Sequence, residues 1–210
     1  MIQHDGMWWP DADKRARQII TGDCERDIAF ILPYIEGREC IVQAGGNVGV
    51  YALALADHFK RVVTFEPDPA NYACLDANLE ARDGLGRVVA FHSALGEKTG
   101  NCVPIAVEAD NCGAHRIGTK DTGPIPIIPL DNIKLNHCDA IWLDVEGFEL
   151  FALKGAERTI RKFWPVIICE EKSLGEVYNV GRHDIENLLE GMGYELTAGF
   201  HNDRLYVRAS

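Results

Sequence analysis

The sequence predicts an α/β domain with a mostly parallel β-sheet, helices on both faces of the sheet and an antiparallel hairpin at the C-terminus. From residue 41 to about residue 193, short runs rich in Val, Ile and aromatic residues alternate with amphipathic helical stretches. This alternation is typical of βαβ units on a parallel sheet. The last two strand-like runs, residues 194–200 and 204–208, are separated by residues 201–203 alone, a spacing that fits a hairpin.

Five strands are expected in the parallel part of the sheet, because five short apolar runs have the composition of buried parallel strands. They are residues 41–44, 62–66, 88–93, 140–144 and 166–170. Residues 48–59 are apolar almost all round, as in a helix packed against a sheet. Asp68 and Pro69 provide an N-cap and a first-turn proline for a helix that runs to about Arg82. Apolar residues at three- and four-residue spacing predict one further helix over residues 148–159.

Two segments lie outside this alternation. Residues 1–37 are predicted to form an N-terminal helical preface, and residues 100–130 carry several prolines and glycines that break any helix. We interpret residues 100–130 as a strand-containing excursion over the edge of the sheet at which ligands bind.

Composition limits the class of protein. The chain has 210 residues, of which 47% are hydrophobic and 25% charged, values that fit a single domain over residues 1–210 and exclude a disordered chain. The formal net charge of -11 argues against a nucleic-acid partner, because such partners are bound by clustered Lys and Arg.

No apolar run approaches the roughly 20 residues of a membrane-spanning helix, and residues 1–10 lack a secretory signal. We expect a cytoplasmic protein with no membrane partner and with seven reduced, mostly buried cysteines; its oligomeric state stays open.

A glycine-rich turn follows the first parallel strand, where V-Q-A-G-G-N-V-G occupies residues 42–49. Gly45 and Gly46 allow a sharp turn and a close approach of a ligand to the backbone, and Gly49 allows close helix packing. The dinucleotide-binding pattern G-x-G-x-x-G needs a glycine at Ala44, so the match to it is incomplete. A tight connection without a ligand is the alternative, but the position between strand and helix favours a ligand.

Glu66 ends the second strand, at the edge where ligands bind in open α/β sheets. A carboxylate at this point can accept hydrogen bonds from both hydroxyls of a ribose. A solvated glutamate at a strand end is the alternative, and the glycine turn at the expected separation makes ribose binding the better interpretation.

Several carboxylates follow the fourth and fifth strands. They are Asp144, Glu146, Glu149, Glu170 and Glu171. Carboxylates that converge on one edge are costly unless they bind a cation, share a proton or pair with basic groups. A sulfonium ligand, a hydroxyl group that loses its proton or a metal ion would each explain them, and a solvated acidic rim is the alternative.

The stretch from residue 42 to residue 170 resembles the FkbM-type S-adenosylmethionine-dependent methyltransferases, which have a Rossmann-like, seven-stranded class I methyltransferase fold. The resemblance rests on A-G-G-N-V-G at 44–49, F-E-P-D-P at 65–69, A-L-G-E-K-T-G at 94–100, P-L-D-N-I at 129–133, L-D-V-E-G-F-E-L-F-A-L-K-G-A at 143–156 and P-V-I-I-C-E at 165–170. The D-V-E-G-x-E sequence followed by L-x-G-A is its most specific part.

This resemblance implies S-adenosylmethionine as the cofactor and a small-molecule or glycan methyl acceptor, with transfer to a hydroxyl of a sugar or other small molecule. It also implies the cofactor-binding residues, which are Gln43, Gly45, Gly46, Asn47, Gly49, Glu66, Ser93 and Ala94. Asp144 is the first candidate for positioning the acceptor or taking its proton, followed by Glu146 and Glu170. No metal is expected, and a divalent cation bound by these carboxylates ranks second.

Two residues depart from the family pattern: Gln43 stands where the first strand usually ends in Asp, and Trp142 where a Lys often precedes D-V-E-G. Two other functions stay open. An NAD-dependent oxidoreductase would also use a glycine turn and Glu66, and a non-catalytic nucleoside-binding or assembly protein could be built on the same scaffold.

Overall fold

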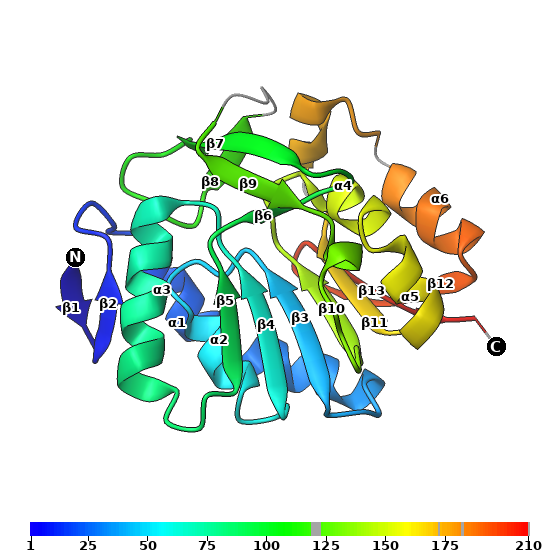
Figure 1. Ribbon diagram of the computed structural model, residues 1–210, viewed down its shortest axis with the longest axis horizontal. Helices are drawn as coiled ribbons and strands as arrows, with labels where there is room; N and C mark the ends of the chain where they lie inside the picture. Colours follow the sequence, from blue (N-terminus) through cyan, green and yellow to red (C-terminus); the bar gives the residue numbers. More distant parts are fainter. Residues whose placement is uncertain (119–122, 172, 182, 210) are drawn as a thin grey trace.

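The chain folds as an α/β structure around one mixed sheet. The computed structural model describes residues 1–118, 123–171, 173–181 and 183–209. The strands of the large sheet are β3 (Cys40–Ala44), β4 (Arg61–Phe65), β5 (Val88–Phe91), β10 (Ala140–Leu143), β11 (Val166–Glu170), β12 (Tyr194–Phe200) and β13 (Asp203–Arg208). Within the described residues this sheet is seven-stranded, in the order β12-β13-β11-β10-β3-β4-β5 (Figure 1).

The strands from β11 to β5 pair in parallel, as predicted, so their carboxyl ends meet at one edge of the sheet. β13 pairs antiparallel with both β11 and β12, which confirms the C-terminal hairpin. The edge at the carboxyl ends is where the connections after β3, β4, β5 and β10 come together. The candidate site lies at this edge.

Helices cover both faces of the sheet (Figure 1). One face packs against α1 (Ala16–Ile31) and α2 (Val50–Leu55), with α3 (Pro69–Arg82) beside them; the other packs against α4 (Glu149–Lys154), α5 (Glu157–Phe163) and α6 (Asp184–Gly191). Successive strand residues alternate between the two hydrophobic clusters: Ile41 joins the cluster with α1 and α2, whereas Val42 joins the cluster with α4, α5 and α6. Short 3-10 helices occur at Leu32–Tyr34, Leu130–Asn132 and Ser173–Tyr178.

The prediction of one helix over residues 148–159 was wrong, because the structure has two helices that meet at Gly155. The Gly155 carbonyl accepts a hydrogen bond from the backbone N–H of Asp131 at 2.9 Å. The Asp131 carboxylate in turn accepts from the backbone N–H groups of Arg158 and Thr159 in the first turn of α5. Asp131 therefore stabilises both the end of α4 and the start of α5.

The N-terminal preface is not wholly helical, which corrects the prediction for residues 1–37. Strands β1 (Ile2–His4) and β2 (Met7–Trp9) form a hairpin, joined by Asp5 and Gly6 with φ values of 49° and 75°. Asp5 and Gly6 form an Asp-Gly pair, which is a strong sequence signal for a hairpin. Trp9 is buried, and the Asn78 side chain on α3 binds the backbone of Trp8 at both its N–H and its carbonyl.

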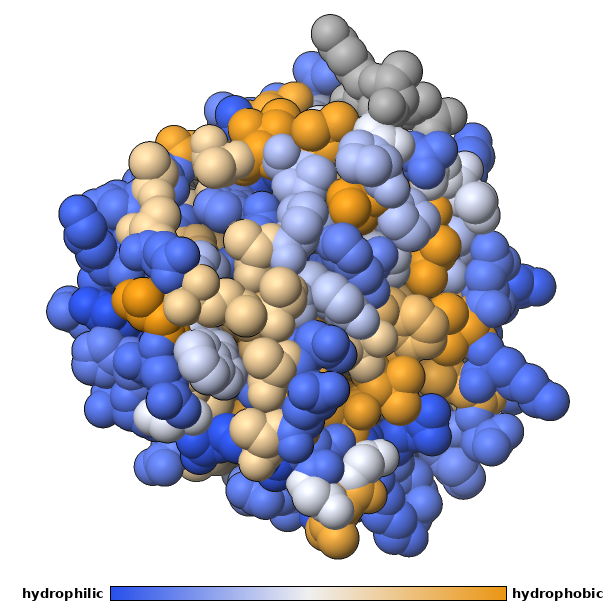
Figure 2. All heavy atoms as spheres, turned by 60° about the vertical axis from the view of Figure 1, so that its left-hand side comes forward, coloured by the Kyte–Doolittle hydropathy of each residue, from blue (hydrophilic) through white to orange (hydrophobic). Residues whose placement is uncertain are grey.

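Residues 94–128 contain a second, smaller sheet, which confirms the strand-containing excursion. Its strands are β6 (Ala94–Leu95), β7 (Gly100–Ala106), β8 (His115–Gly118) and β9 (Ile125–Ile128), in the order β6-β9-β7-β8 among the described residues. Val103, Ile105 and Val107 of this region are exposed, and Figure 2 shows hydrophobic surface at the top of the molecule. All seven cysteines are free and buried, as expected. No helix in the described part of the chain has the length and apolar character needed to cross a membrane.

Candidate active site

A cavity of about 460 Å³ opens at the carboxyl ends of β3, β4 and β10, a size typical of small-molecule sites. Residues of α1 and α2 form one wall, and residues 107–117, which we call the cover segment, form another. Most of the predicted site residues line it: Gln43, Gly45, Gly46, Asn47, Glu66, Ser93, Ala94, Asp144 and Glu146. Gly49 lies just outside the lining, as the N-cap of α2. The structure thus brings the predicted cofactor and acceptor residues to one place.

The glycine turn after β3 is packed directly against the end of β10. Gly45 has a φ of +88°, and a Cβ atom added there would lie 1.9 Å from the carbonyl oxygen of Asp144. The backbone N–H groups of Gly45 and Gly46 both donate to the Phe65 carbonyl of β4, at 3.1 and 2.8 Å. A side chain at Gly45 would therefore force the turn away from both neighbouring strands.

The side chain of Gln43, on β3, holds this turn in place through a hydrogen bond. Its side chain is buried, with its Nε2 donating to the Gly45 carbonyl at 2.8 Å and its Oε1 accepting from the Thr64 hydroxyl at 2.5 Å. The neutral amide at this position is therefore engaged with protein groups at both of its ends.

Glu66 is buried at the tip of β4 and accepts two backbone hydrogen bonds. Its Oε2 accepts from the N–H of Asn47 at 2.7 Å, and its Oε1 accepts from the N–H of Asp68 at 2.8 Å. Burial raises the pKa of Glu66 to about 8, although both backbone hydrogen bonds act in the opposite direction. Each carboxylate oxygen keeps a second lone pair, so Glu66 can accept two further hydrogen bonds when it is ionised.

Ser93 and Ala94 follow β5 and line the cavity beyond Glu66. The Ser93 side chain is buried, and its Oγ has no hydrogen-bond partner among the described residues. A buried hydroxyl of this kind is available to a ligand. The neighbouring His92 stacks on Tyr72 with ring centroids 4.5 Å apart and is not among the residues that line the cavity.

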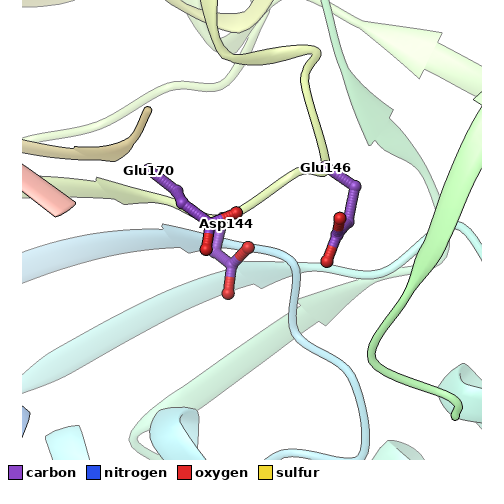
Figure 3. A group of neighbouring side chains, drawn as sticks. All are labelled: Asp144, Glu146 and Glu170. Carbon is purple, nitrogen blue, oxygen red and sulfur yellow. The ribbon is translucent and has the colours of Figure 1, made fainter. Parts of the chain in front are cut away.

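Asp144, Glu146 and Glu170 converge beyond the tips of β10 and β11 (Figure 3). One oxygen from each of the three carboxylates lies within 4.8 Å of the other two. Asp144 and Glu146 line the cavity, and Glu170 is buried at the end of β11. Three carboxylate oxygens so placed can receive a proton from a substrate, and they are also the ligand type that a hard divalent cation prefers.

Glu149 holds the loop that carries two of these carboxylates. Its side chain is buried, and its Oε1 accepts from the backbone N–H of Val145 at 3.0 Å and of Gly147 at 3.2 Å. Glu146 and Gly147 both have positive φ values, 53° and 98°, so this loop needs such support. Burial raises the pKa of Glu149 to about 7. The supporting role was missed in the sequence, where Glu149 looked like another carboxylate past the strand.

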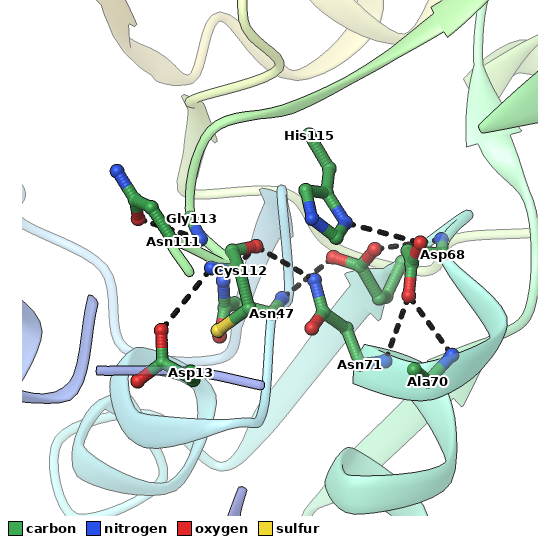
Figure 4. A network of polar contacts seen from close by, with 10 residues as sticks. Asp13, Asn47, Asp68, Ala70, Asn71, Asn111, Cys112, Gly113 and His115 are labelled. Atoms are coloured by element: carbon green, nitrogen blue, oxygen red, sulfur yellow. Dashed lines mark hydrogen bonds and ion pairs between the residues drawn. The ribbon is translucent and has the colours of Figure 1, made fainter. Parts of the chain in front are cut away.

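A network of polar contacts ties the cover segment to Asn47, one of the residues predicted to bind a cofactor, and to residues beside it (Figure 4). The Cys112 carbonyl accepts from the side-chain amides of Asn47 and Asn71, at 3.1 and 2.9 Å. The Cys112 N–H donates to the Asp13 carboxylate at 3.1 Å, which links the segment to the start of α1. His115 pairs with Asp68 at 3.0 Å, and this hydrogen bond raises the pKa of His115. Sequence reasoning missed Asp13, Asn71 and Cys112, because their contacts are long-range.

The wall formed by α1 and α2 carries a buried carboxylate, Asp27. The Tyr51 hydroxyl donates to Asp27 Oδ2 at 2.6 Å, and the Tyr51 ring meets Trp142 edge to face with centroids 5.2 Å apart. The Trp142 Nε1 donates to Asp203 at 3.4 Å. Asp27, Tyr51 and Asp203 also line the cavity and were not predicted, whereas Trp142 was noted only as a departure from the family pattern.

A family model described as the methyltransferase FkbM domain matches residues 43–196. The chain is 23% identical to the methyltransferase sdnD of Sordaria araneosa in an alignment that covers 94% of this chain and 89% of that protein.

Solved structures share the fold. A methyltransferase FkbM from Methylobacillus flagellatus KT superposes with a TM-score of 0.56 at 22% identity; the match covers 80% of this chain but only 43% of that one. A putative O-methyltransferase from Klebsiella pneumoniae has a TM-score of 0.52 at 15% identity, with 96% and 84% coverage. The M. jannaschii TYW2 structure, a complex with AdoMet, has a TM-score of 0.53 at 15% identity, with 98% and 84% coverage.

Proposed function

The chain belongs to the FkbM methyltransferase family, and we propose that it transfers the methyl group of S-adenosylmethionine to a hydroxyl of a sugar or another small molecule. One observation carries this proposal: a single cavity contains the glycine turn, the buried Glu66 and the carboxylate of Asp144. We propose further that residues 1–210 act as one catalytic domain with a Rossmann-like class I arrangement.

The residues around the cavity fit S-adenosylmethionine. Glu66 keeps free lone pairs for the two ribose hydroxyls, and the absence of a Cβ at Gly45 lets the glycine turn pack against the Asp144 carbonyl, beside the cavity. Ser93 supplies a buried hydroxyl next to Ala94, where the adenine ring would lie. The cavity volume of about 460 Å³ is within the range of sites for ligands of this size.

When bound, S-adenosylmethionine supplies an electrophilic methyl group on a positively charged sulfur. The protein has three tasks: to align the acceptor with this group, to exclude water and to remove a proton. The cover segment closes the cavity on one side through Cys112 and His115, which limits the access of water. Asp144 stands at the end of β10 on the cavity wall, where its carboxylate can orient an acceptor hydroxyl and take its proton.

Glu146 and Glu170 support Asp144 in this proposal. Their oxygens lie within 4.8 Å of an Asp144 oxygen, so a proton accepted at Asp144 is stabilised by neighbouring negative charge. Glu149 keeps the loop in place through the N–H groups of Val145 and Gly147. The acceptor is a small molecule or glycan in this proposal, and the net charge of -11 disfavours nucleic acid.

Binding and transfer experiments test the proposal. Isothermal titration with S-adenosylhomocysteine and, separately, with NAD should show binding of the first at micromolar order and none of the second. Labelled S-adenosylmethionine would then be supplied with a panel of sugars and sugar-bearing metabolites, and the label should pass to a hydroxyl oxygen. Binding of NAD without S-adenosylhomocysteine would instead support an oxidoreductase. Binding of S-adenosylhomocysteine without transfer to any member of the panel would contradict the proposed acceptor class.

A further inference from the structure

S-adenosylmethionine has a second charged end, the α-ammonium and α-carboxylate of its methionine part, and the structure points to the group that binds the ammonium. We propose that Asp27, held by the hydroxyl of Tyr51, binds the α-ammonium of the cofactor. The inference rests on the proposed function, and it assigns a binding role to two residues outside the glycine turn and the carboxylate group of β10 and β11.

The position of the ammonium site follows from the order of the strands. Glu66 and Ser93 lie at the ends of β4 and β5, so adenosine occupies that side of the cavity. The methionine part must then extend over the next strands in the sheet, β3 and β10. Trp142 of β10 pairs with Gln43 of β3, and the Tyr51 ring packs edge to face on Trp142. Tyr51 and its partner Asp27 therefore lie at the methionine end.

Gln43 does not supply the anion that the ammonium needs. The side chain is a neutral amide, its Nε2 is bound to the Gly45 carbonyl and its Oε1 to the Thr64 hydroxyl. An ammonium taken out of water requires a charged or strongly accepting partner. A carboxylate on another element can provide it.

Asp27 has the burial and the fixed geometry of a binding carboxylate. Only 6% of the residue is exposed, yet it lines the cavity. Oδ2 accepts from Tyr51 at 2.6 Å, while Oδ1 lies 3.4 Å from Arg26 and 3.7 Å from His201. Both of these side chains are more than half exposed, so solvent screens the ion pair between Arg26 and Asp27. A carboxylate has about four lone-pair sites, which leaves room for the ammonium beside Tyr51.

The test compares two ligands that differ only at this end. S-adenosylhomocysteine carries the amino-acid part, and 5′-deoxy-5′-methylthioadenosine has the same adenosine and sulfur without it. Isothermal titration should show that Asp27→Asn lowers the affinity for S-adenosylhomocysteine by about 10- to 100-fold, because a desolvated charge pair is lost. Its affinity for methylthioadenosine should stay within about twofold of wild type.

Two further variants complete the experiment. Tyr51→Phe removes only the hydroxyl. It should lower the affinity for S-adenosylhomocysteine, by less than Asp27→Asn does, and leave the affinity for methylthioadenosine unchanged. This variant also carries the test if Asp27→Asn does not fold. Asp23→Asn is the matched control, since Asp23 lies one turn earlier on α1 and pairs with Arg26 at 2.8 Å. It should change neither affinity.

The outcomes separate this inference from the proposed function. The role of Asp27 would be overturned if Asp27→Asn lowered the affinity for both ligands equally. It would also be overturned if Asp27→Asn left the affinity for S-adenosylhomocysteine unchanged while Asp144→Asn lowered it. Failure of wild-type protein to bind either ligand would instead contradict the proposed function itself.

Discussion

The backbone N–H of Asn47 donates to Glu66 Oε2 at 2.7 Å, so the glycine turn after β3 is tied to the carboxylate at the tip of β4. The Glu66 side chain thus holds the turn in place, and in the proposed function it has a binding task as well. Its remaining lone pairs would accept hydrogen bonds from the two ribose hydroxyls. Both tasks are performed best by the ionised form, although burial favours the protonated one.

Cofactor affinity should therefore rise with pH. The pKa of Glu66 is about 8 in the free protein, and ribose hydroxyls that donate to the carboxylate will lower it, so binding releases a proton. We expect the affinity for S-adenosylhomocysteine to increase up to about tenfold per pH unit below pH 8 and to level off above it. Titration calorimetry in two buffers of different ionisation enthalpy measures both effects. Glu66→Gln should bind weakly with no slope, and a flat wild-type profile would remove Glu66 from the site.

Asp144→Asn should separate chemistry from binding. The amide keeps the shape of the side chain, so S-adenosylhomocysteine should bind with nearly wild-type affinity, while methyl transfer slows by about 100- to 10,000-fold. Rates are measured with and without a chelator. Full wild-type activity in the chelator supports Asp144 as the base. Loss of activity that added Mg²⁺ restores would show that the carboxylates bind a metal instead.

The raised pKa of Glu149 should make the protein less stable as the pH rises. Its folded-state pKa, about 7, lies above the ordinary value of 4.5. A raised pKa contributes stability that is complete below pH 4.5 and is lost as pH rises through 7, roughly 3 kcal/mol at most. Glu149→Gln is neutral at every pH and should reduce the fall in unfolding free energy between pH 5 and 8, measured by urea denaturation. Glu157→Gln, at an exposed pair with Arg161, is the control; an unchanged slope in Glu149→Gln would refute the prediction.

Gly45→Ala should abolish cofactor binding, because the new Cβ would meet the Asp144 carbonyl at 1.9 Å and the residue has a φ of +88°. Gly84→Ala is a suitable control, since a Cβ added at Gly84 would meet no atom within 4 Å beyond its chain neighbours. Thermal unfolding with and without S-adenosylhomocysteine distinguishes the two. A normal ligand-induced shift in Gly45→Ala would show that the turn can move without loss of the site.

Asp13→Ala should loosen the cover segment. One Asp13 oxygen accepts from the N–H groups of Ala16 and Cys112, at 3.2 and 3.1 Å, so the residue caps α1 and anchors the segment together. We expect a loss of about 1 to 3 kcal/mol in unfolding free energy and faster release of S-adenosylhomocysteine in stopped-flow experiments. Asp13→Asn can still accept and should be affected less. Unchanged release from Asp13→Ala would show that the segment does not limit exit.

The sequence could predict those parts of the fold that are encoded within short stretches. The five parallel strands are contiguous apolar runs, and the turn at Gly45 and the carboxylate of Glu66 directly follow two of them. The break between α4 and α5 could not be predicted, since the spacing of apolar residues continues through Gly155. Asp131, distant in sequence, binds the Gly155 carbonyl and caps α5.

The walls of the site could not be predicted either, because the contacts that form them join residues distant in the sequence. Asp13 and Cys112 are 99 positions apart, and Asp27 and Tyr51 are 24 apart. Their residue types are ordinary, and only packing brings them together. Local patterns therefore predicted the floor of the cavity and not its walls.

Cys112 gives the protein a built-in chemical reporter. Its thiol is buried, and burial raises the pKa of the thiol, so little of the reactive thiolate is present. The backbone of Cys112 is at the same time hydrogen-bonded to the side chains of Asp13, Asn47 and Asn71. Alkylation of this sulfur requires those bonds to open first. The rate at which a maleimide labels Cys112 in the native protein will therefore report how often the cover segment opens, and a ligand that keeps this segment closed will lower the rate.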